Sequence, residues 1–96
     1  MMTMNKKVLL IIDNVRIKEY NEMNVVVERY EDVYVPTKKQ HEKKWRFKGY
    51  ASTIFKALLL IQRNELLIDK ESIHNLSSYL EQVKESNDKL LEAVIE

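Results

Sequence analysis

The chain has 96 residues, of which 45% are hydrophobic and 32% are charged, and its formal net charge is +1. This length predicts one domain, residues 1–96, with a flexible start over residues 1–6. The lack of cysteine excludes disulfides and favours the cytoplasm. The apolar runs are too short for a bilayer and the start MMTMNKK is no signal peptide, so we expect no membrane partner.

The first half of the chain is predicted to be a small antiparallel β-meander of three or four strands, over residues 7–50. Residues 8–12 are a continuous aliphatic run, and the next segment, 15–20, alternates apolar and charged side chains as a half-buried strand does. Residues 25–35 are rich in Val and Tyr, which favour strands. Pro36 ends this strand because its nitrogen cannot donate a ladder hydrogen bond.

A further strand, KWRFKGY, contains the only tryptophan and the only glycine of the chain. Alternation places Trp45, Phe47 and Gly49 on one face, which we expect to point to the core. The other face, expected to point to water, carries Lys44, Arg46, Lys48 and Tyr50. Gly49 is predicted to allow a sharp turn between this strand and the helix that follows, because glycine tolerates such backbone.

The second half of the chain predicts two α-helices, at about 52–67 and 72–95, part of the helical region 51–96. Ser52 and Ser72 are the expected N-caps, because a serine hydroxyl accepts a free N–H of the first turn. The first helix is apolar over more than half of its circumference and must be covered on more than one side. The whole pattern predicts an α+β fold with both helices packed on one face of the sheet.

The last helix repeats apolar residues at spacings of three and four from Ile73 to Val94, with one polar residue, Asn87, at a heptad a position. Such an Asn favours two-stranded coiled coils, so we expect a homodimer. Packing of the Ile73–Val83 half within one chain is the alternative. The dimer-interface candidates are Leu80, Val83, Asn87, Leu90, Leu91 and Val94.

A basic segment between Thr37 and Lys48 contains six cations and one acidic residue, Glu42. The candidates for contact with nucleic acid or a protein partner are Lys38, Lys39, Lys43, Lys44, Arg46 and Lys48. A row of cations can follow a phosphate backbone, but exposed lysines on a strand also protect a sheet edge from aggregation. Because the aromatic residues of this strand are expected to face inward, base stacking is not part of the prediction.

No motif in the chain marks catalysis or a cofactor. The two histidines, His41 and His74, are isolated, and a zinc site needs three or four nitrogen or sulfur ligands, with occasional carboxylates. We therefore expect no enzyme activity, no metal and no cofactor.

The segments W45-R-F-K-G49-Y50 and A57-L58-L-L-I61 resemble small bacteriophage and prophage proteins of a domain-of-unknown-function family. The resemblance implies a mobile-element setting, in which small proteins often bind host machinery, and it brings no catalytic residues. Our leading expectation is therefore a non-enzymatic accessory protein that binds a host protein, as an inhibitor of host defence, in the bacterial cytoplasm. The alternative is a nucleic-acid-binding accessory protein that uses the basic segment 38–48.

Overall fold

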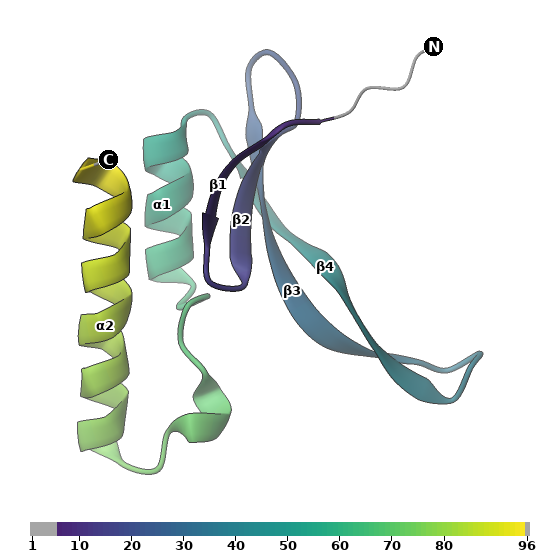
Figure 1. Cartoon of the computed structure of the whole chain (residues 1–96), viewed down its shortest axis with the longest axis vertical. Helices are drawn as coiled ribbons and strands as arrows, with labels where there is room; N and C mark the ends of the chain where they lie inside the picture. The colour runs from purple at the N-terminus through teal and green to yellow at the C-terminus, as the bar shows by residue number, and fades with distance from the viewer. Residues whose placement is uncertain (1–5, 96) are drawn as a thin grey trace.

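The computed structural model describes residues 6–95, in which a four-stranded sheet is followed by two α-helices (Figure 1). The strands are β1 (Val8–Ile12), β2 (Val15–Glu19), β3 (Val25–Val35) and β4 (Gln40–Ala51), and they pair antiparallel in chain order. The helical elements are α1 (Ile54–Arg63), the short 3-10 helix η1 (Lys70–Ser72) and α2 (Leu76–Ile95). The predicted α+β fold is confirmed. Of the predicted flexible start, residues 1–5 lie outside the described residues.

The turns between strands use the residues that suit them. Asp13 adopts a positive φ of 51° between β1 and β2, a conformation in which Asp and Asn are enriched. Asn21 closes the next turn, because its side-chain oxygen accepts the backbone N–H groups of Met23 and Asn24. β3 ends at Val35, directly before Pro36, as predicted.

Both helices begin later than predicted, because other side chains cap them. Thr53, not Ser52, caps α1, and its hydroxyl accepts the backbone N–H of Lys56 at 3.0 Å. The Asn75 side-chain oxygen accepts the backbone N–H of Ser78 at 2.8 Å at the start of α2. Ser72 instead donates its hydroxyl to Asp69.

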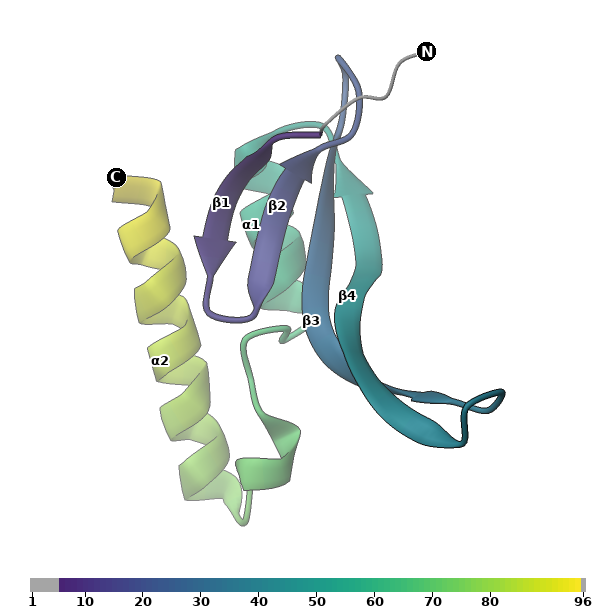
Figure 2. The same cartoon turned by 45° about the vertical axis from the view of Figure 1, so that its right-hand side comes forward.

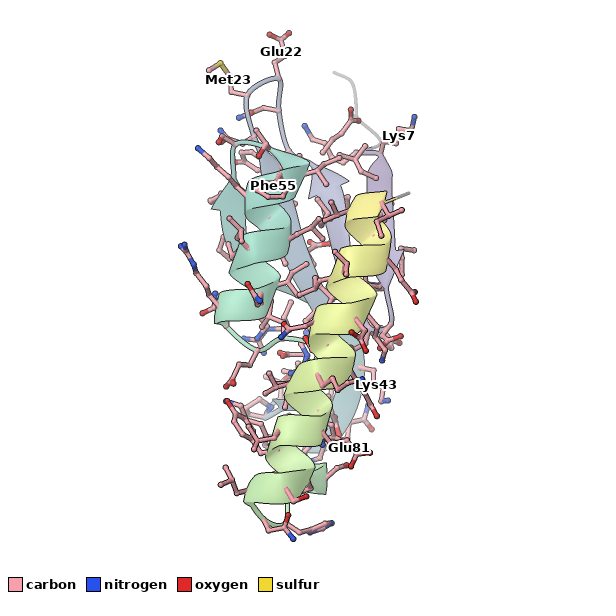
Figure 3. The ribbon with its side chains drawn as sticks, turned by 90° about the vertical axis from the view of Figure 1, so that its left-hand side faces the viewer. Lys7, Glu22, Met23, Lys43, Phe55 and Glu81 are labelled. Carbon is pink, nitrogen blue, oxygen red and sulfur yellow. The ribbon has the colours of Figure 1, made fainter. Side chains whose placement is uncertain are left out.

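The two helices lie on the same side of the sheet, with α1 against β3 and β4 and α2 beside α1 and β1 (Figure 3). The core forms where the aliphatic residues of the strands meet those of the helices, because this burial removes the most apolar surface from water. Its fully buried members are Val15, Ile17, Val27, Ala57 and Ile61. The far half of the β3–β4 hairpin extends beyond the helices as an arm (Figures 1 and 2).

A β-bulge decides which face of the sheet carries the aromatic residues. Val27 pairs with Gly49, whereas its neighbour Glu28 pairs with Phe47, so Lys48 is an extra residue without a partner on β3. Opposed residues share a face and neighbours alternate. Because Val27 faces the core, Gly49 does too, while Phe47 lies with Glu28 on the face away from the helices.

The bulge corrects the prediction that Trp45, Phe47 and Gly49 share the core face. Trp45 pairs with Tyr30 on the face away from the helices, and Phe47 on the same face is 54% exposed. Only Gly49 faces α1, and it lies inside β4 rather than at a corner. Its φ is not positive, so the reason for glycine is space: an added Cβ would lie 2.7 Å from Leu60 Cδ1.

Candidate functional site

The sheet face away from the helices carries several groups of aromatic side chains, which together we call the aromatic row. Trp45 lies beside Tyr30 with ring centroids 5.2 Å apart, and Phe47 lies 4.7 Å from Tyr50. The ring centroid of Tyr20, just past the end of β2, lies 4.8 Å from the ring centroid of Tyr50. The members of the row are Tyr20, Tyr30, Tyr34, Trp45, Phe47 and Tyr50, of which all except the half-buried Trp45 are exposed.

Cations on the same face lie next to these rings. The guanidinium carbon of Arg16 is 4.0 Å from the ring centroid of Trp45, a cation–π geometry. Arg16 is also held by Glu28, whose Oε1 is 2.7 Å from Nε, and the Lys18 ammonium lies 3.7 Å from the same oxygen. Trp45 is therefore held by contacts with both the Arg16 guanidinium and the Tyr30 ring.

The row continues onto the β3–β4 arm. Tyr34 and His41 lie opposite each other there, with ring centroids 5.3 Å apart, and His41 Nδ1 is 3.2 Å from an Asp32 oxygen. At the other end of the row, a hydrogen bond with Tyr20 raises the pKa of the Tyr50 phenol. The aromatic row thus spans most of the length of β4.

The predicted basic residues do not form one row. Lys43 lies opposite Asp32 on the face of the aromatic row, whereas Lys44 and Arg46 lie on the other face. Lys38 and Lys39 are in the turn at the tip of the arm, and all five are exposed. Lys48 is half-buried and its ammonium is 2.8 Å from Glu31.

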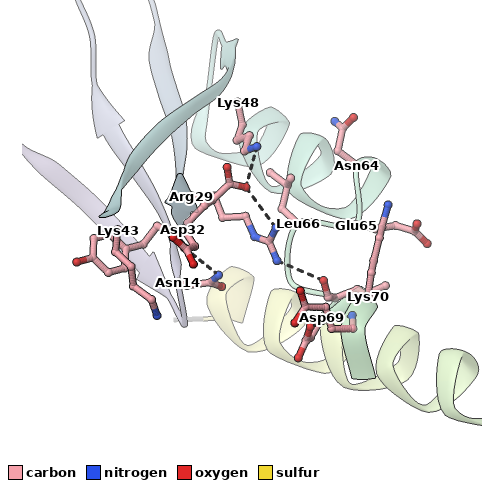
Figure 4. Close-up of a pocket in the computed structure, with 14 residues that line it drawn as sticks. Asn14, Arg29, Asp32, Lys43, Lys48, Asn64, Glu65, Leu66, Asp69 and Lys70 are labelled. Atoms are coloured by element: carbon pink, nitrogen blue, oxygen red, sulfur yellow. Dashed lines mark hydrogen bonds and ion pairs between the residues drawn. The ribbon is translucent and has the colours of Figure 1, made fainter. Parts of the chain in front are cut away.

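The Lys48–Glu31 pair belongs to an open cavity of about 710 Å³ between the sheet and the loop after α1 (Figure 4). Arg29 bridges its two sides, since it contacts Glu31 at 3.3 Å and donates to the Ile68 carbonyl at 3.3 Å. Burial raises the pKa of Glu31, but the hydrogen bonds and charges of Lys48 and Arg29 outweigh burial and leave the pKa below its ordinary value. Lys48 and Arg29 thus both pair with Glu31, and Arg29 connects the sheet to the loop.

Residues 6–95 contain no group of three or more His, Asp or Glu side chains placed to hold a metal ion. His74 is exposed and lies far in the sequence from His41, which pairs with Asp32. Within the same residues, neither α1 nor α2 combines the length and apolar content that a bilayer span requires.

Helix α2 presents the predicted dimer residues unequally. Leu90 is 7% exposed and is part of the core, so the prediction that it is available to a second chain is wrong. Val83 is half-buried, and the Asn87 side chain accepts a hydrogen bond of 3.0 Å from Gln62 of the same chain. The candidates that remain exposed on α2 are Leu80, Asn87, Leu91 and Val94.

Sequence reasoning missed the aromatic row because a bulge has no clear signature in the residue types. One signal was present: if Val25 and Val27 face the core, alternation places Tyr30 and Tyr34 on the opposite face. Trp45 and Phe47 could then have been assigned to the same side as their partners on β3. No family model, curated protein or solved structure matches this chain, so the resemblance to phage proteins stays a prediction.

Proposed function

We propose that this protein binds single-stranded nucleic acid on the aromatic row. The observation that supports the proposal is the exposure of several rings on a sheet face that neither α1 nor α2 covers. Bases of a single strand can stack on such rings, and each stack contributes about 1–3 kcal/mol without requiring a particular sequence. The proposal includes no catalytic step and fits a bacterial cytoplasm, where a chain without cysteine needs no disulfide.

The length of the row suits a short oligonucleotide. Residues that alternate along a strand are about 6.6 Å apart, so the part of β4 from His41 to Tyr50 extends for about 30 Å. The rings lie along this line in three groups: Tyr34 with His41, Tyr30 with Trp45, and Phe47 with Tyr50 and Tyr20. A single strand laid along β4 would meet one group after another.

Charge favours a single strand over a duplex. Residues 29–48 contain seven Lys and Arg against three Asp and Glu, so this part of the β3–β4 hairpin, which includes the arm, carries +4 while the whole chain carries +1. The arm can attract a phosphate backbone, but Glu28 and Asp32 on the face of the row partly neutralise the cations there. Affinity would then depend on stacking as well as on phosphate contacts, and duplex DNA, whose bases are already stacked, offers only the phosphates.

The chain has one tryptophan, which allows a direct test. Titration with a short oligothymidine should quench the fluorescence of Trp45 if a base stacks beside it. We expect tighter binding to the single strand than to a duplex of equal length, and affinity that falls with rising salt. Phe47→Ala should weaken binding by about 5- to 150-fold, the equivalent of one lost stack.

Phe55→Ala is the matched control, because Phe55 is a similarly exposed phenylalanine on α1, away from the row. It should leave the affinity unchanged. Equal losses in both variants, equal affinity for duplex, or no binding of any oligonucleotide would each refute the proposal. A protein captured from nuclease-treated lysate that depends on Phe47, together with no oligonucleotide binding, would instead favour the host-protein alternative.

A further inference from the structure

Helix α2 has a second apolar face that nothing in residues 6–95 covers. Its buried face contacts the body through Ser86, Leu90 and Ala93, and Tyr79 donates a hydrogen bond to Glu65, which raises the pKa of Tyr79. The neighbouring face borders the groove between α1 and α2, which Leu91 and Val94 line. This outer stripe consists of Leu76, Leu80, Leu91, Val94 and Ile95, all of them exposed.

We infer that the outer stripe is the interface of a homodimer in which two α2 helices pack antiparallel. The spacing of its members supports a second copy of this chain as the occupant. Leu76 and Leu80 are one helical turn apart, Leu91 and Ile95 are one turn apart, and the two pairs are separated by about three turns. These four positions therefore have the same spacing from either end, as a two-fold, self-complementary interface requires, whereas Val94 falls opposite Ser77 of the partner copy.

The antiparallel register places Leu80 of one chain opposite Leu91 of the other, and Leu76 opposite Ile95. At the centre it places Lys84 close to Asp88 of the partner copy, twice by symmetry. Both side chains are exposed, and within one chain the Lys84 ammonium lies 3.4 Å from an Asp88 oxygen. In the dimer, each Lys84 would also lie near Asp88 of the partner copy, which adds an attraction between the chains. Charge and apolar spacing thus favour the same register.

The size of the face is more than half of what a standard interface buries per partner. A helix of 20 residues is about 30 Å long and 10 Å wide, and α1, with 10 residues, adds about 15 Å by 10 Å beside it, so the face covers roughly 450 Å². Standard interfaces bury about 800 Å² per partner. The apolar groove of about 190 Å³ between α1 and α2, with Phe55 at its edge, adjoins the stripe and extends the contact.

This dimer differs from the coiled coil predicted from the heptads. There, Leu90 and Asn87 were part of the seam, but Leu90 is in the core and Asn87 is bonded to Gln62. The seam is rotated toward Leu91, and the helices run in opposite directions. Because the helices and the aromatic row are on opposite faces of the sheet, the aromatic row of each chain stays exposed in the dimer. The inference therefore does not depend on the proposed function.

Charged substitutions test the register. In sedimentation equilibrium at high micromolar concentration, the wild-type chain should be a dimer. Leu80→Glu alone and Leu91→Lys alone should each raise the dissociation constant at least about tenfold. An equimolar mixture of the two variants should form a heterodimer, because the introduced glutamate then meets the introduced lysine while the second pair stays Leu–Leu. Glu85→Lys, on the far side of α2, is the control and should stay dimeric.

A second measurement uses the absence of cysteine in this chain. Leu80→Cys mixed with Leu91→Cys should form a disulfide between the two variants on oxidation. Leu80→Cys alone should not crosslink, because its two copies are displaced by about 16 Å along the antiparallel helices. A monomeric wild-type chain would overturn the inference, as would failure of the mixed charge variants to associate. Efficient crosslinking of Leu80→Cys with itself would indicate a parallel dimer and would overturn it as well.

Discussion

The close approach of α1 to β4 at Gly49 predicts a specific cost for any larger side chain at that position. A Cβ there would lie 2.7 Å from Leu60 Cδ1, and a valine adds two further methyl groups. Overpacking of this kind typically costs about 1–3 kcal/mol. The higher strand propensity of valine returns up to about 1 kcal/mol, since the backbone of Gly49 has no positive φ. We therefore expect Gly49→Val to lower the free energy of unfolding by about 1–2 kcal/mol.

The contact with Leu60 can be isolated by a double-mutant cycle. Leu60 is only half-buried, so Leu60→Ala alone should cost about 2 kcal/mol, the low end of the range for such truncations. In the double variant the valine occupies the space that the leucine leaves, and the loss should be at least about 1 kcal/mol smaller than the summed single losses. Urea unfolding followed by far-UV circular dichroism measures each value. Additivity within about 0.5 kcal/mol would show that the clash with Leu60 is not the reason for the glycine.

Two further predictions concern the core and the cavity. The first is measured in the Leu80→Glu background at low protein concentration, where the inferred dimer should dissociate. There Leu90→Ala should cost about 2–4 kcal/mol in urea unfolding, whereas Leu91→Ala should cost less than about 1 kcal/mol, and equal costs would contradict the core assignment. Glu31→Gln should be destabilising near neutral pH, because the folded pKa of Glu31 lies below its ordinary 4.5. The ionised Glu31 carboxylate therefore stabilises the fold fully above pH 4.5, and this stabilisation is lost as the pH falls through the folded pKa. Unfolding free energies of both proteins measured from neutral pH to about pH 3 should converge, and a difference that stays constant would refute this.

Most of the fold could be predicted from the residues themselves. Alternation in residues 15–20, the Val- and Tyr-rich segment before Pro36, and the helical spacing after residue 52 each depend on local chemistry, so they specify strands and helices without knowledge of the rest. The apolar excess of the first helix likewise required cover on more than one side, and β3, β4 and α2 all contact it. Helix starts were less predictable, because Ser52 and Thr53 are both good caps.

Which surface each side chain occupies was decided only in three dimensions. Strand residues alternate with a period of two, so the extra residue Lys48 at the bulge separates Gly49 from Phe47 and leaves the aromatic row facing away from the helices. Helix α2 has two neighbouring apolar stripes. The stripe that contains Leu90 packs against the core, and the stripe that contains Leu91 stays exposed. Local sequence determines the period of an element, but its phase relative to the core is set by the segments that pack against it.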